Sequence, residues 1–132
     1  MKREINKLVV HCTATLPNCT VATLLNGFKR RGWKAPGYHY LITPEGDTVQ
    51  IWPLNKIANG AQGYNTRSIH VAYIGGILQD GTPHDTRTLA QHQALKQIIK
   101  YLLGLYPSAV VVGHNELNPA KACPCFKVKE EL

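Results

Sequence analysis

Long apolar runs are missing from this sequence. The longest contain four or five residues, whereas a membrane-spanning helix needs about 20. The charged beginning of the chain, residues 1–6, is not followed by an apolar stretch of signal-peptide length either. We therefore expect no membrane partner, and a protein that is made in the cytoplasm and stays there until something releases it.

Acidic residues are also scarce, with 8 Asp and Glu against 15 Lys and Arg, which gives a net charge of +7. A surface of this kind attracts an anionic partner such as nucleic acid, an acidic membrane or a bacterial cell-wall polymer. The sequence has no repeated Arg-Gly signature and no aromatic RNA-binding pattern near its basic residues. Nucleic acid is therefore the weakest of these candidates, and we expect residues 29–31 to form a solvated helix end.

Only four cysteines occur, and their positions do not suggest a disulfide framework. Cys12 directly follows a histidine, and a single proline separates Cys123 from Cys125. This arrangement fits a reducing compartment better than an oxidising one. We expect free thiols, with a Cys12–Cys19 or a Cys123–Cys125 bridge as the alternatives.

The order of predicted elements indicates an α/β fold. At 132 residues with 44% hydrophobic content, the chain is long enough for one domain with its own core. Capping signals at Thr20 and at Thr88–Gln91 predict helices over residues 20–31 and 88–105. The predicted inner face of the second helix contains Leu89, Leu95, Ile98, Ile99 and Leu102. Apolar runs predict strands over residues 7–12, 38–43, 48–52, 68–75 and 109–113.

These elements predict a single domain over residues 1–132, with a central mixed β-sheet flanked by helices. The segment 53–66 is expected to be a long loop, of the kind that is often functional. The last predicted strand, 109–113, is expected to be buried, and the tail 115–132 to be irregular.

Three ligand-type side chains lie far apart in the sequence. His11 and His114 each stand at the end of a predicted buried strand, where α/β sheets place their sites. Cys123 follows in a proline-containing loop that can fold back, with Cys125 as the competing thiol. Structural zinc sites gather their ligands in tight pairs, whereas catalytic sites draw them from separate segments and leave one position open. The spacing therefore favours a catalytic zinc ion.

Two further residues are candidates for stabilising an oxyanion. Lys121 precedes Cys123 by two residues, so it points to the same side of an extended segment. Tyr38 follows a glycine at the start of a predicted strand and offers a phenolic donor. Taken singly, Lys121 is explained better as a solvated surface lysine and Tyr38 as a half-buried strand aromatic.

The remaining histidines carry weaker signals. We expect His39 to support the site or the core rather than to bind metal. His84 and His92 are expected at the surface, and His70 has no assigned role.

Taken together, the ordered motifs closely resemble the type 2 N-acetylmuramoyl-L-alanine amidases. The nearest pattern is that of the short phage lysozymes that are amidases, which are relatives of the peptidoglycan recognition proteins. The likeness spans about residues 8–126. It is carried by Val-His-Cys-Thr-Ala-Thr, Gly-Trp, Gly-Tyr-His-Tyr, Gly-Tyr-Asn, Ser-Ile, Gly-Gly and Gly-His…Lys-Ala-Cys-Pro.

The resemblance implies a zinc ion bound by His11, His114 and Cys123, with Tyr38 and Lys121 as catalytic residues. It implies cleavage of the amide between N-acetylmuramic acid and L-alanine in bacterial peptidoglycan, as in a phage or prophage endolysin, by a protein expected to be a monomer. The alternative is a peptidoglycan-binding module of the same fold that does not cut. Retention of all five residues favours the enzyme.

The sequence departs from the family pattern at a few positions. Gly60 stands where many relatives carry a histidine, and His70 stands where relatives usually have a small residue. The segment from His114 to Cys123 is one residue longer than in the nearest phage pattern, and Cys125 replaces a small polar residue. None of these departures removes a predicted ligand.

Overall fold

The computed structural model describes residues 3–132, which form a five-stranded sheet in the order β3-β2-β4-β1-β5. Neighbouring strands are parallel except for the antiparallel pair of β2 and β3, which confirms the predicted mixed sheet. The strands are β1 (Lys7–Cys12), β2 (Tyr40–Ile42), β3 (Thr48–Gln50), β4 (Ser68–Tyr73) and β5 (Val110–Gly113). The helices are α1 (Val21–Arg30), α2 (Leu89–Leu105), α3 (His114–Leu117) and α4 (Val128–Glu131), with a 3-10 turn at Asn65–Arg67.

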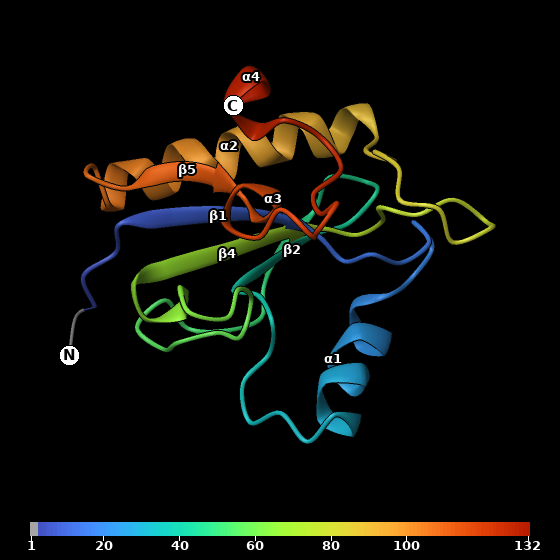
Figure 1. The fold of residues 1–132 in the computed structure, drawn as a ribbon, viewed down its shortest axis with the longest axis horizontal. Helices are drawn as coiled ribbons and strands as arrows, with labels where there is room; N and C mark the ends of the chain where they lie inside the picture. The colour runs from blue at the N-terminus through green and yellow to red at the C-terminus, as the bar shows by residue number, and fades with distance from the viewer. Residues whose placement is uncertain (1–2) are drawn as a thin grey trace.

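The two faces of the sheet have different roles. Alternate residues of a strand point to opposite faces, and in β1 the side chains of Leu8, Val10 and Cys12 belong to the main apolar core. That core includes the buried side of α2, which runs along one face of the sheet in Figure 1. Val9 and His11 therefore point to the opposite face, where the loop before β4 approaches the sheet.

Helix α2 follows its predicted bounds, because the capping box of Thr88 and Gln91 forms as expected. The predicted inner position of Leu89 is wrong, since this residue is 74% exposed. At 100° per residue, Leu89 lies about 120° around the helix from Leu95. Gln91, rather than Leu89, lies in the buried stripe of α2. Its amide donates to the carbonyls of Ile42 and Ile74, at 3.1 Å each.

Helix α1 begins after the predicted cap Thr20, whose hydroxyl accepts from the backbone N–H of Thr23 at 3.2 Å. Figure 1 shows that α1 lies away from the sheet. Phe28 is its only buried residue, and it stacks on Trp33 with ring centroids 5.6 Å apart. The short apolar face of α1 is therefore covered mainly by the segment that follows it.

The C-terminal part of the chain differs from the prediction. Two one-turn helices, α3 and α4, interrupt the expected irregular tail, and residues 118–127 between them are irregular as predicted. Strand β5 is not buried throughout, because it is an edge strand and Val110 is 51% exposed.

Tyr73 and Arg87 hold the tail against the rest of the domain. The Tyr73 hydroxyl donates to the Pro124 carbonyl at 2.7 Å. The guanidinium of Arg87 lies 3.4 Å from the centroid of the Phe126 ring and pairs with Asp85 and Glu131.

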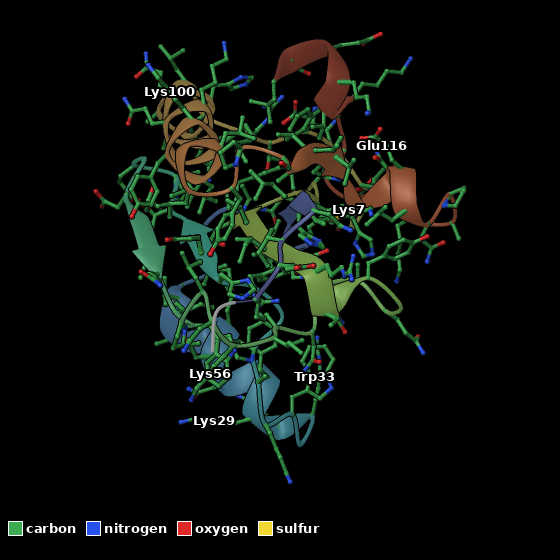
Figure 2. The ribbon with its side chains drawn as sticks, turned by 90° about the vertical axis from the view of Figure 1, so that its left-hand side faces the viewer. Lys7, Lys29, Trp33, Lys56, Lys100 and Glu116 are labelled. Carbon is green, nitrogen blue, oxygen red and sulfur yellow. The ribbon has the colours of Figure 1, made fainter. Side chains whose placement is uncertain are left out.

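Basic side chains are spread over the surface. Figure 2 shows Lys29 beside α1 and Lys100 on α2, at opposite ends of the view. Lys29 and Arg30 are exposed in the last turn of α1, as predicted for a solvated helix end. Within residues 3–132, no helix is both long and apolar enough to span a bilayer.

Candidate metal centre and active site

The fold brings His11, His114 and Cys123 together. The parallel register pairs Val10 of β1 with Gly113 of β5, so that the next residues on the two segments are the two histidines. Their rings lie 4.7 Å apart, and one potential ligand atom from each of the three residues lies within 4.8 Å of the others. Segments more than 100 residues apart thus supply one compact group of donors.

The spacing of these donors suits zinc. The Cys123 sulfur lies 3.7 Å from Nδ1 of His11. Tetrahedral zinc, with bonds of about 2.3 Å to sulfur and 2.0 Å to nitrogen, places these two atoms about 3.5 Å apart. The donor set and its geometry therefore fit a zinc ion without large rearrangement.

The two competing cysteines occupy different surroundings. The backbone N–H of Cys12 donates to the Cys123 sulfur at 3.1 Å, and this sulfur lies beside Nδ1 of His11. The Cys125 sulfur lies instead 4.0 Å from the Cys12 sulfur and donates to the Gly76 carbonyl at 3.5 Å. Burial raises the pKa of the Cys125 thiol to about 12. Only Cys123 thus faces the two histidines.

All four cysteines lie within the described part of the chain and are free. The structure thus has the free thiols that the sequence predicted.

Both candidate histidine ligands are held in the form that a metal needs. Burial lowers the pKa of His11 well below 6.5, and neighbouring imidazoles lower it further. Burial, together with the charge of Lys121, also lowers the pKa of His114. The imidazoles are therefore neutral at pH 7, and no proton must be removed before their nitrogens coordinate.

Tyr38 lies against this group, with its ring centroid 5.1 Å from that of His11. Its hydroxyl donates to the Cys12 carbonyl at 3.3 Å. Burial raises the pKa of Tyr38 above its ordinary value, so the phenol keeps its proton at neutral pH and remains a donor.

Lys121 is exposed and lines a hollow of about 330 Å³ that also exposes His114. The rest of the lining is formed by Gly60, Ala61, Gln62, Tyr64, Leu117 and Asn118. Lys121 therefore borders a space that His114 also lines and that is open to a substrate.

Two residues of the site were not assigned from the sequence. Nε2 of His11 is hydrogen-bonded to Nδ1 of the buried His70 at 2.8 Å, and Nε2 of His70 to Oδ1 of Asn65 at 2.9 Å. The unusual histidine at position 70 was the available signal. The sequence could not identify His11 as the partner of His70, because only the parallel pairing of β1 with β4 brings these two distant histidines together.

His39 lies in the core beneath this group, which is one of the two roles that the sequence predicted for it. Its side chain is fully buried. Its Nδ1 accepts from the backbone N–H of His70 at 3.0 Å, and its Nε2 donates to the Lys56 carbonyl at 2.8 Å. Of the two histidines expected at the surface, His84 is exposed and His92 is half-buried.

His39 should make the fold sensitive to acid. Burial lowers its pKa from 6.5 to about 4, so the unfolded chain takes up a proton at higher pH than the folded protein. The stabilisation is complete above pH 6.5 and is lost as the pH falls towards 4, a loss of about 3 kcal/mol. Denaturant unfolding of metal-free protein between pH 7 and 4 measures it.

In a His39→Gln variant the fall in unfolding free energy should be smaller by about that amount. The exposed His84 offers a control, since His84→Gln should follow the wild-type pH dependence. Parallel curves for wild type and His39→Gln would contradict the prediction.

Comparison with known proteins agrees with this geometry. A family model described as N-acetylmuramoyl-L-alanine amidase matches residues 1–126. The chain belongs to this amidase family. The endolysin of Escherichia phage T7 is 35% identical over 130 residues, which cover 97% of this amidase and 85% of that relative.

Solved structures of similar fold include two groups. The endolysin LysCS of Clostridium intestinale URNW, an N-acetylmuramoyl-L-alanine amidase, matches with a TM-score of 0.80 and 26% identity, covering 92% of this chain and 76% of that one. The peptidoglycan recognition protein PGRP-LB of Drosophila matches with a TM-score of 0.76 and 19% identity. The match covers 94% of this chain and 76% of that one. The second likeness concerns the fold alone. The sequence-based identification of the family, the fold and the amidase activity on peptidoglycan is confirmed.

Proposed function

We propose that this amidase binds one zinc ion through His11, His114 and Cys123 and uses it to cleave the bond between N-acetylmuramic acid and L-alanine. The observation that carries the proposal is the convergence of these donors to within 4.8 Å. Two neutral imidazoles and one thiolate suit zinc and leave a position free for water or substrate. When bound, zinc would supply Lewis acidity, which polarises the amide carbonyl and acidifies a water molecule.

Tyr38 and Lys121 would then act on the amide carbonyl oxygen as negative charge develops there. Tyr38 supports this role because its phenol is protonated and lies against His11. Lys121 supports it because its side chain and His114 line the same hollow. Donors aimed at a developing oxyanion lower the barrier more than donors that bind the ground state.

The wider context of the reaction also belongs to the proposal. The likeness to phage endolysins supports a role in cell lysis for a phage or prophage. The protein would act as a monomer once it is released to the cell wall. The net charge of +7 would favour association with an anionic wall.

Digestion of purified peptidoglycan tests the function directly. Mass spectrometry should detect free stem peptides that begin with L-alanine, together with glycan strands that carry unsubstituted lactyl carboxylates. Chelation should stop product formation and added zinc should restore it. Sedimentation of the protein with peptidoglycan, without release of any peptide under zinc-loaded conditions, would instead identify a binding module.

A further inference from the structure

His70 is placed to act on His11 from within the protein. Strands β1 and β4 are parallel, with Val9 opposite His70 and His11 opposite Ala72. The two histidines thus lie diagonally across the strand pair and on the same face of the sheet. Both are buried, at 1% and 0% exposed, and the 2.8 Å hydrogen bond between their rings is shielded from water.

The direction of each hydrogen bond follows from the backbone. The N–H of Ala61 donates to Oδ1 of Asn65 at 2.8 Å, which fixes the orientation of that amide. The same oxygen faces Nε2 of His70, so this nitrogen must carry the proton. The His70 ring is 0% exposed, and its two hydrogen-bond partners are an amide and an imidazole rather than a carboxylate. A ring buried in this way is neutral, and a neutral imidazole has a single N–H. Its Nδ1 is therefore an acceptor.

The consequence for His11 is a single tautomer. Its Nε2 must donate to Nδ1 of His70, since the latter carries no proton. Its Nδ1 is then left with a free lone pair, and this is the nitrogen that faces the Cys123 sulfur at 3.7 Å. The opposite tautomer would direct two lone pairs at each other within the buried pair.

The surroundings leave His70 little freedom to rotate. The ring of His39 lies parallel to it, with centroids 6.0 Å apart and planes inclined by 6°. On the loop side, a Cβ added at Gly60 would lie 2.3 Å from Nδ1 of His70, so only glycine leaves room for the imidazole. The guanidinium of Arg3 secures this loop by donating to the carbonyls of Leu54 at 2.9 Å and Thr66 at 3.1 Å.

We infer that His70, supported by Asn65, is a positioning residue that fixes the tautomer and orientation of His11 so that Nδ1 becomes the metal ligand. The inference rests on the proposed zinc site and identifies its supporting residues. Partners of this kind commonly contribute a factor of about 10–100 in metal affinity.

The first test measures zinc affinity rather than activity, by competition with a chromophoric chelator. His70→Phe keeps a ring but removes the acceptor, and zinc affinity should fall by about 10–100-fold. His70→Asn places an amide oxygen near the position of Nδ1 and should recover most of the loss. His84→Gln is the control, because it alters an exposed histidine outside this hydrogen-bond network, and it should bind zinc like the wild type.

The second test does not depend on the folding of any variant. Long-range ¹H–¹⁵N NMR correlations of metal-free wild-type protein should show His11 protonated at Nε2 and bare at Nδ1. A folded His70→Phe protein with wild-type zinc affinity, or a His11 protonated at Nδ1, would overturn the inference. The readouts are independent of lysis, so a protein that shows the expected tautomer and affinities but releases no stem peptide refutes only the proposed activity.

Discussion

Replacing Cys123 by alanine is expected to abolish stoichiometric zinc binding, whereas replacing Cys125 should leave it unchanged. The Cys123 sulfur faces Nδ1 of His11 at 3.7 Å, while that of Cys125 points towards Cys12 and Gly76. Loss of a ligand should weaken binding by more than the roughly 100-fold that can follow the loss of a supporting residue. Peptidoglycan cleavage should disappear with the metal.

Metal analysis of the two purified variants after dialysis against equal zinc measures this difference. Circular dichroism verifies that each variant is folded, so that a loss of zinc is not mistaken for a loss of structure. Cys125→Ala is a matched control, because it removes an identical group two residues away. The ligand assignment is wrong if Cys125→Ala loses the metal and Cys123→Ala keeps it.

The second large effect is expected at Lys121 and Tyr38, where activity should be lost without loss of metal. Neither side chain belongs to the donor group, so Lys121→Ala and Tyr38→Phe should each retain one zinc per chain. Removing one donor to a developing oxyanion typically slows turnover by about 10²–10³-fold. The loss should appear in kcat more than in KM, because the interaction is made mainly in the transition state.

Release of stem peptide from soluble muropeptide gives the two constants separately. Lys127→Ala is the control for surface charge, since Lys127 is an exposed lysine outside the lining of the hollow. Unchanged turnover of Lys121→Ala would show that Lys121 is only a surface charge. A Tyr38→Phe protein with wild-type kcat would remove the phenol from the mechanism in the same way.

Features set by neighbouring residues could be predicted from the sequence. The β-branched run at residues 7–12 forms β1, and the caps at Thr20 and Thr88 start both long helices where expected. The predicted inner position of Leu89 was wrong, because a helix start and an apolar residue do not specify which side meets the sheet. Gln91 occupies the buried stripe instead, since its amide satisfies two carbonyls at the ends of β2 and β4.

The sequence by itself determined the family and the types of side chain available for chemistry, because ordered motifs and residue identities are local information. The tertiary structure decided which of these groups meet. The register of β1 against β5 sets His11 beside His114. The contact of Pro124 with Tyr73 holds the tail so that Cys123, rather than Cys125, faces His11. The contact of His70 with His11 likewise depends on parallel pairing and on the fold of the loop at Gly60. Such contacts join residues far apart in the chain, and only packing of the whole domain specifies their distances and directions.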